Sequence, residues 1–358
     1  MEPYKAKKLP IEYSINKELI NLLSEVEETY GEYKGFLKNM SYDYTSFLEC
    51  AFVSDLFYSF KIDGAKIEKE YMFHAPYMIK SNDYIEFNNM KKALLIGVSD
   101  FSNGEVKLDT FNKINKALFQ NCKKNSLTKG SGKLRKIQNY ILKPGIAGSS
   151  VSFIPPVYTE LNSLMNNLID YINMMEEHPI ISSIVTHYQY EKIHPYISGN
   201  GKIGRLVLSI QMSSRKKEPP ILFLSETFDK LKNTYFTLLS GEVEEDIDKF
   251  IKFVLQSIIE QCNLNIKKIR RLNKIYKKDV EEFKETIGGT TINKVYPFIV
   301  KKIVFTTNDI VSECKLHINS VNKVLNKMVE QGYLIKEKKP GSNRVTFCYK
   351  NFYDVFMS

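Results

Sequence analysis

The sequence predicts a mainly α-helical protein. Apolar residues recur at the i, i+3, i+4, i+7 spacing of a helix with one buried face at 181–188 and again at 203–210. The same spacing returns near the end of the chain, at 295–303 and 321–329. Apolar and polar residues alternate at 345–349, which is typical of a strand. We therefore expect a helical core and a C-terminal β-hairpin.

Length and composition bound the class of protein. A chain of 358 residues, 43% of them hydrophobic, has room for two or three domains with a sizeable core. No stretch approaches the ~18 consecutive apolar residues of a membrane span, and Met1–Lys8 has no apolar run behind its charges. We expect neither a membrane span nor a signal peptide. The cysteines are scattered without close pairs, which argues against disulfides or zinc and favours a cytoplasmic protein.

The segment from His194 to Arg205 carries the strongest functional signal. Gly199, Asn200 and Gly201 form a turn at the start of a core helix, and glycines let backbone N–H groups approach a ligand closely. The unpaired N–H groups and the positive dipole end of that helix favour an anion. His194 could act as a general base, and Arg205 lies one turn into the helix, within reach of a phosphate. The pattern indicates a phosphate-handling site.

This segment resembles the Fic motif, H-P-F-x-(D/E)-G-N-G-R-x-x-R. The matching residues are His194, Pro195, Gly199, Asn200, Gly201 and Arg205. Tyr196 and Lys202 are conservative replacements, whereas Ser198 stands at the acidic position. Upstream, 132–135 and 153–156 are similar to landmarks of the Fic core, the latter near the flap that clamps the substrate. The resemblance spans most of 85–215 and implies a Fic-type helical core with a small β-hairpin flap.

The resemblance implies a protein adenylyltransferase. Such an enzyme moves AMP from ATP to a Tyr, Ser or Thr hydroxyl of a target protein or of itself. His194 would be catalytic and would take the proton of that hydroxyl. The nucleotide-binding residues would be Gly199, Asn200, Gly201, Lys202 and Arg205. Backbone N–H groups and the Asn200 amide would hold the α- and β-phosphates, and Arg205 the terminal phosphate.

Ser198 departs from the family pattern at the metal position. In the family an acidic residue there holds Mg²⁺, which bridges the phosphates of ATP. A neutral hydroxyl is a much poorer ligand for a hard dication, although Mg²⁺ can keep several waters and bind phosphate oxygens. The alternatives left open are a slow ATP-dependent enzyme, a different phosphorylated donor, and a core that only binds nucleotide.

A second resemblance lies far upstream. Ser59 to Gly64 is similar to the inhibitory helix motif (S/T)-x-x-x-E-(G/N), whose Glu pairs with the last Arg of the Fic motif and blocks the terminal-phosphate site. Asp63 is one methylene shorter, so its pair with Arg205 would be strained or bridged by water. The alternative is the plain end of an aromatic-rich core helix, with Gly64 as the terminating residue.

The last seventy residues predict three short helices and a hairpin, the order of a winged helix, similar to the domain that often follows a Fic core in bacterial proteins. The third helix would enter the major groove of DNA. Its DNA-binding residues would be Asn319, Asn322, Lys323 and Lys327, with Arg344 in the wing. The net charge of +10 suits such a partner, although many winged helices bind proteins instead.

Four parts are expected along the chain. They are an N-terminal helical region with the inhibitory helix at 1–84, the Fic core at 85–215, a helical extension at 216–287 and the winged helix at 288–358. The leading function is adenylyl transfer restrained by Asp63 and weakened by Ser198. The runner-up is a DNA-binding regulator whose impaired Fic core senses a nucleotide. The target protein and a homo-oligomeric state are left open.

Overall fold

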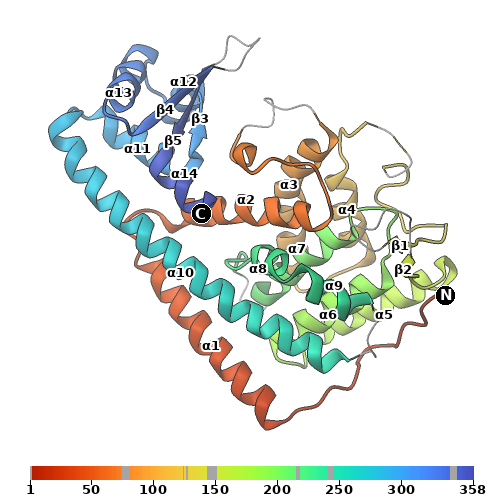
Figure 1. The fold of residues 1–358 in the computed structure, drawn as a ribbon. Coiled ribbons are helices and arrows are strands. Elements are labelled where there is room, and N and C mark those ends of the chain that lie inside the picture. Colours follow the sequence, from red (N-terminus) through yellow and green to blue (C-terminus); the bar gives the residue numbers. More distant parts are fainter. Residues whose placement is uncertain are drawn as a thin grey trace. The chain divides into compact units, whose positions relative to one another are not determined.

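The computed structural model describes residues 2–74, 81–123, 125, 128–142, 151–214, 218–240, 246–338 and 345–358. As expected, the protein is mainly α-helical (Figure 1). The chain forms two compact units. The first unit comprises residues 1–28, 58–66 and 80–261, and the second comprises residues 29–57, 67–79 and 262–358.

Figure 1 labels most of the helices and strands, which follow one another along the chain in the order of their numbers within each type. The helices are α1 (Lys17–Lys38), α2 (Tyr44–Ile62), η1 (Lys69–Tyr71), α3 (Asn82–Ser102), α4 (Leu108–Leu118), η3 (Tyr158–Glu160), α5 (Leu161–Met174), α6 (Pro179–Ile193), α7 (Asn200–Ser214), α8 (Ser225–Lys230), α9 (Lys232–Ser240), α10 (Ile247–Thr286), α11 (Thr291–Lys302), α12 (Thr307–Cys314), α13 (Ile318–Glu330) and α14 (Lys350–Met357). The strands are β1 (Ile141–Leu142), β2 (Val151–Phe153), β3 (Val304–Phe305), β4 (Leu334–Lys338) and β5 (Val345–Tyr349). Within the described ranges, no helix has the length and apolarity needed to span a membrane.

The core of the first unit is built around α6 and α7. Nearly every residue of these two helices is buried, including the polar ones, because they pack on each other and are covered by α5 and α3. Pro179 begins α6, where its missing N–H leaves no hydrogen bond unmade. The helix ends at Ile193, immediately before His194. The turn between two buried helices is therefore held rigidly by the core.

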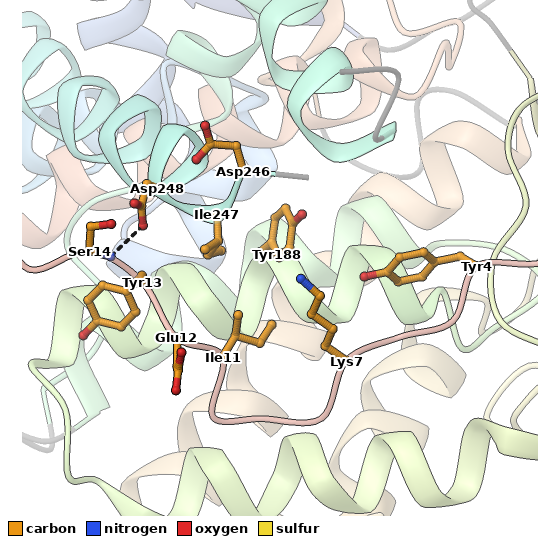
Figure 2. Close-up of a pocket in the computed structure, with 10 residues that line it drawn as sticks. All are labelled: Tyr4, Lys7, Ile11, Glu12, Tyr13, Ser14, Tyr188, Asp246, Ile247 and Asp248. Atoms are coloured by element: carbon orange, nitrogen blue, oxygen red, sulfur yellow. Dashed lines mark hydrogen bonds between the residues drawn. The ribbon is translucent and has the colours of Figure 1, made fainter. Parts of the chain in front are cut away.

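A short hairpin, the expected flap, lies upstream of this pair. Strands β1 and β2 are antiparallel, with Ile141 opposite Phe153. The N-terminal segment lies against the end of β2, because the N–H of Tyr4 donates to the carbonyl of Ile154 at 2.8 Å. A cavity of about 370 Å³ lies between this segment, α6 and the start of α10. Figure 2 shows Lys7 and Tyr188 among the residues that line it.

The second unit contains the expected C-terminal helices and hairpin. Helices α11, α12 and α13 accompany a three-stranded antiparallel sheet with strand order β3-β5-β4, and β3 lies between α11 and α12 in the chain. Thr306 caps α12 through a capping box with Asp309, as the residue type predicts. The third helix begins at Ile318, and His317 serves as its N-cap. Strand β3 was not predicted, since its two residues are too few to give a periodic pattern. Helix α14 was not predicted either, although Phe352, Val355 and Phe356 form a buried stripe at helical spacing.

A buried carboxyl group joins α10 to this sheet within the second unit. The hydroxyl of Tyr296 donates to Asp279 at 3.2 Å, and the hydroxyl of Tyr349 donates to the same oxygen. Burial raises the pKa of Asp279 above its ordinary value. Because a buried carboxyl group needs hydrogen-bond partners, the two tyrosines fix how β5 and α11 meet α10.

Candidate active site

His194 occupies the turn that ends α6. Its backbone adopts the left-handed conformation, with φ 49° and ψ 61°, while its N–H still donates to the carbonyl of Tyr190 at 3.0 Å. This conformation is uncommon for a residue with a Cβ and costs on the order of 1 kcal/mol or more. The surrounding core holds the residue in it, so the backbone that carries the imidazole is fixed in advance.

Arg135 holds the backbone on both sides of this turn. Its Nε donates to the carbonyl of His194 at 3.0 Å, and its Nη2 donates to the carbonyl of Pro156 at 2.6 Å. Its own N–H donates to the carbonyl of Pro195 at 3.0 Å. The side chain is buried. The guanidinium of Arg135 thus connects the turn at His194 with the segment that follows β2. The sequence around 132–135 did not predict this role.

The imidazole of His194 is neutral at physiological pH. Burial lowers the pKa of His194 to about 4, the nearby charge of Arg135 adds to the effect, and a backbone contact with Glu191 opposes it. A neutral imidazole can accept a proton, which is the state that a general base requires.

The glycine loop that follows is closed by Asn200. The Asn200 side chain accepts the N–H of Tyr196 at 2.9 Å and donates to the carbonyl of the same residue at 2.8 Å. Gly199 has φ +82°, and a Cβ there would lie 2.7 Å from Leu118. The Asn200 amide therefore makes its hydrogen bonds inside the loop. The N–H groups in the first turn of α7 have no acceptor within the helix and are available to a ligand.

Arg205 lies buried on α7 and is held by the segment that ends α2. Its Nε donates to Oγ of Ser59 at 2.9 Å, and its Nη2 donates to the carbonyl of Ser59 at 2.8 Å. The same Nη2 contacts Oδ1 of Asp63 at 2.9 Å. The shorter acid thus reaches Arg205 directly, without a bridging water. Gly64, with φ +79°, ends the helix, so Asp63 sits at a defined helix terminus.

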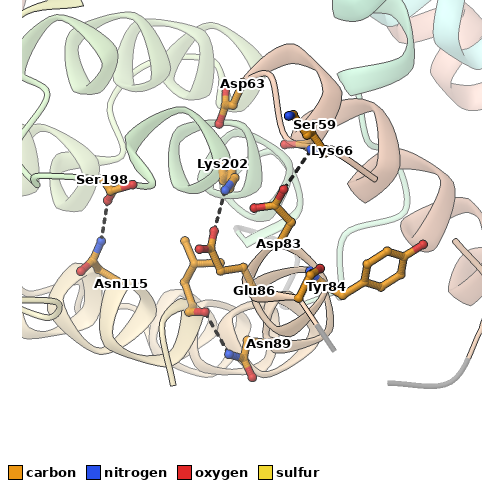
Figure 3. Close-up of polar contacts among 12 residues, drawn as sticks. Ser59, Asp63, Lys66, Asp83, Tyr84, Glu86, Asn89, Asn115, Ser198 and Lys202 are labelled. Carbon is orange, nitrogen blue, oxygen red and sulfur yellow. Dashed lines mark hydrogen bonds and ion pairs between the residues drawn. The ribbon is translucent and has the colours of Figure 1, made fainter. Parts of the chain in front are cut away.

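Lys202 is bound to α3. Its Nζ lies 2.7 Å from Oε2 of Glu86 and 4.1 Å from the ring centre of Phe60, and both members of the ion pair are nearly buried. Figure 3 shows this pair, with Ser59 and Asp63 on a neighbouring segment. Sequence reasoning missed Glu86, because a partner 116 positions away leaves no local pattern.

The residues around Ser198 do not fit a Mg²⁺ ion held by the protein. The Asn115 amide donates to the carbonyl of Ser198 at 3.1 Å (Figure 3). It also accepts the N–H of Gly132 at 2.7 Å. These contacts fix the loop and bring no carboxylate to it. In the part of the chain that the structure describes, no group of three or more His, Cys, Asp or Glu side chains could hold a metal ion.

The residues expected to contact DNA lie in the second unit. Asn319 and Lys323 are exposed on α13. Asn322 accepts a hydrogen bond from Thr307 at 3.2 Å, and Lys327 donates to the carbonyl of Ile287 at 2.9 Å. Arg344 lies outside the described residues. The structure therefore leaves two of the predicted residues facing outward on this helix and uses two in contacts within the unit.

A buried helix pair joined by a histidine loop and a glycine turn, beside a short flap hairpin, defines a Fic fold. Residues 105–212 match the model of the Fic/DOC family. The chain is 28% identical to the protein adenylyltransferase Fic of Aedes aegypti and 30% identical to that of Drosophila willistoni, in each case over 104 residues. These alignments cover 28% of this chain and 20% of each relative.

Solved structures share the fold at lower identity. A Fic family protein from Desulfovibrio desulfuricans superposes with a TM-score of 0.60 at 18% identity, covering 94% of this chain and 97% of that one. Fic-1 from C. elegans gives a TM-score of 0.51 at 17% identity, covering 72% of this chain and 74% of that one. At these identities the likeness shows the fold alone.

Proposed function

We propose that the protein transfers AMP from ATP to a hydroxyl side chain of a target protein or of itself. The observation that carries the proposal is the juxtaposition of a neutral His194 with the N-terminus of α7 and the buried cation Arg205. Curated relatives of the Fic domain are named protein adenylyltransferases, which supports the same reaction.

The reaction divides among the residues of this chain as follows. The α- and β-phosphates bind the N–H groups of the first turn of α7, and the terminal phosphate binds Arg205. His194 removes the proton of the target hydroxyl as its oxygen attacks the α-phosphorus. The bond from that phosphorus to the oxygen bridging the α- and β-phosphates breaks, and pyrophosphate leaves. The products are an adenylylated side chain, pyrophosphate and a proton on His194, which passes to solvent.

We propose further that Asp63 restrains this reaction. Arg205 donates to Ser59 and Asp63 in the structure, so a terminal phosphate must displace Asp63 before it can bind the same guanidinium. The displaced contact is an ion pair with a buried cation, which makes the competition strong. ATP bound without the Arg205 contact would be held less firmly at its terminal phosphate.

The proposed reaction is tested by the position of the label that the protein retains. The Asp63→Gly protein is incubated, alone and with cell lysate, with ATP labelled either at the α- or at the γ-phosphate. Adenylyl transfer leaves the α label on protein and releases the γ label with pyrophosphate. Retention of the γ label, or of neither label, contradicts the proposal.

Replacement of Ser198 by aspartate is expected to make the reaction depend on Mg²⁺. The new carboxylate would supply the anionic oxygen that the loop lacks, since hard dications prefer such ligands. We expect the Mg²⁺-stimulated rate of Asp63→Gly/Ser198→Asp to exceed that of Asp63→Gly by about tenfold or more, as for one added charge-stabilising contact. Ser198→Asn is the control, because asparagine has the same shape as aspartate and adds an oxygen without a charge. Equal stimulation by both substitutions would exclude a role for the carboxylate.

We propose DNA binding by the C-terminal region as a second function. The exposed Asn319 and Lys323 on α13, together with exposed Lys336 and Lys338 on β4, support it. We expect the full chain to bind duplex DNA with an affinity that falls steeply as salt rises. Lys323→Ala should weaken binding and lower the salt dependence by about one charge, whereas Lys301→Ala, whose lysine is paired with Glu49, should not. Binding unaffected by salt would contradict this function.

A further inference from the structure

Two carboxyl groups approach the backbone of α7 where glycines leave room for them. A Cβ at Gly201 would lie 2.9 Å from Oδ1 of Asp63. A Cβ at Gly204 would overlap the carboxylate of Glu191, whose Cδ lies 3.1 Å from that position. Asp63 follows α2, whereas Glu191 belongs to α6. Arg205, next to Gly204 on the same helix, is influenced by the charges of both.

Only one of these two carboxyl groups is hydrogen-bonded to Arg205. Asp63 accepts from the guanidinium, while Oε1 of Glu191 is buried and has no hydrogen-bond partner among the described residues. A buried acceptor without a partner costs on the order of 1–3 kcal/mol, and more when it is charged. Burial raises the pKa of Glu191 to about 8, Asp63 acts in the same direction, and Arg205 opposes them. With Asp63 in place, burial therefore favours the protonated form of Glu191.

Three further ionisable groups in this region have pKa values that burial shifts away from neutral pH. Burial lowers the pKa of His187 to about 3, and its Nε2 is 3.0 Å from the hydroxyl of Tyr235 on α9. Burial raises the pKa of Tyr235 above its ordinary value. His194, three residues after Glu191, has its pKa lowered to about 4. Of these groups, Glu191 alone changes charge between about pH 6 and 9.

We propose that Glu191 is a second counter-ion for Arg205, which ionises and keeps the guanidinium in place when Asp63 withdraws, and which takes up a proton when a terminal phosphate arrives. The ionisation of Glu191 when Asp63 withdraws concerns the protein alone. The uptake of a proton when the phosphate arrives rests on the proposed binding of ATP at Arg205. Glu191 is thus a positioning residue that acts through Arg205.

The direction of the proton movement follows from the charges. Withdrawal of Asp63 removes a negative charge near Glu191, so the pKa of Glu191 falls and the group ionises beside Arg205. The phosphate of a bound nucleotide brings negative charge back, so the pKa rises and a proton is taken up. Between these two pKa values the dissociation constant for ATP should increase with pH, by up to about tenfold per pH unit.

The nucleotide half is tested by calorimetry of ATP binding to the full chain from pH 6 to 9, in buffers that differ in ionisation heat. We expect Asp63→Gly to take up close to one proton on binding, and Asp63→Gly/Glu191→Gln to take up much less and to lose little affinity at high pH. Glu160→Gln, at an exposed glutamate of η3, is the matched control. The titration of ATP itself is common to all variants. Equal proton uptake with and without Glu191 would overturn the proposal.

The protein-only half is tested by the pH dependence of thermal unfolding. A carboxyl group with a raised pKa in the folded state makes stability fall as pH rises from the unfolded value of about 4.3 to the folded value. This fall should be smaller in Glu191→Gln, and in Asp63→Gly it should end at a lower pH than in the wild type. An identical profile in the wild type and Glu191→Gln would overturn the proposal. Failure of every variant to bind ATP would overturn its nucleotide half together with the proposed function.

Discussion

Replacing His194 by alanine in the Asp63→Gly protein is expected to lower the rate of AMP transfer by about 10²–10⁴-fold, the range for loss of a general base. His194 makes its backbone contacts through N–H and carbonyl groups, which an alanine retains. Folding and ATP binding should therefore change little. The measurement is the initial rate of α-label transfer at saturating ATP, with the ATP dissociation constant measured beside it.

His178 offers a matched control for this substitution. It lies at the other end of α6 as the N-cap, where its ring contacts Glu27 at 3.3 Å. His178→Ala should leave the transfer rate within about twofold, as expected for a partly exposed ion pair. A His194→Ala protein that keeps its rate, or that loses ATP binding together with rate, would show that His194 is not the base.

The lowered pKa of His194 also sets the acid side of the pH profile. A base whose pKa is about 4 stays unprotonated at all higher pH values. The acid limb of kcat/KM, which reports the free enzyme, should therefore lie well below the ordinary histidine value of about 6.5.

Replacing Asp63 by glycine is expected to raise the transfer rate by about 5–150-fold, which corresponds to a coupling free energy of about 1–3 kcal/mol. The substitution removes the carboxylate that competes with the terminal phosphate for Arg205. The two bonds from Arg205 to Ser59 remain and keep the guanidinium in position. The measurement compares rates at ATP concentrations below and above saturation.

Asp63→Asn separates charge from shape in this contact. The amide fills the same space near Gly201 and can still accept a hydrogen bond, but it has no charge. An activation by asparagine that approaches that of glycine would assign the restraint to the ion pair. If neither substitution raised the rate, Asp63 would have no inhibitory role.

The local parts of this architecture could be predicted from the sequence. Helical periodicity placed α6 and α7, and the glycine turn placed the start of α7 beside His194. The Asp63–Arg205 contact was also expected, but only because the segment around Asp63 resembles a known motif. The sequence suggested a strained or water-bridged pair, whereas the structure gives a direct contact at 2.9 Å, since the end of α2 lies close enough for the shorter side chain.

The long-range partners could not be predicted. Glu86 pairs with Lys202 across 116 positions, and Arg135 holds the carbonyl of His194 across 59. Glu86 is a single charged residue on α3, and such residues are usually solvated. Arg135 lies outside the helices, in a segment whose resemblance to the Fic core does not indicate its partners. The carboxyl group of Glu191 fits against α7 because Gly204 has no Cβ. This contact could not be predicted from the sequence, because it depends on how α6 packs against α7.

Whether His194 directs AMP to a protein hydroxyl is best tested by identifying the group that becomes attached to the protein. Asp63→Gly and Asp63→Gly/His194→Ala are each incubated with ATP and cell lysate, and modified peptides are identified by mass spectrometry. The account predicts AMP esters on Ser, Thr or Tyr with Asp63→Gly and none when His194 is also replaced. Phosphate alone on those side chains, AMP esters of equal abundance with both proteins, or no modified peptide with either would contradict it.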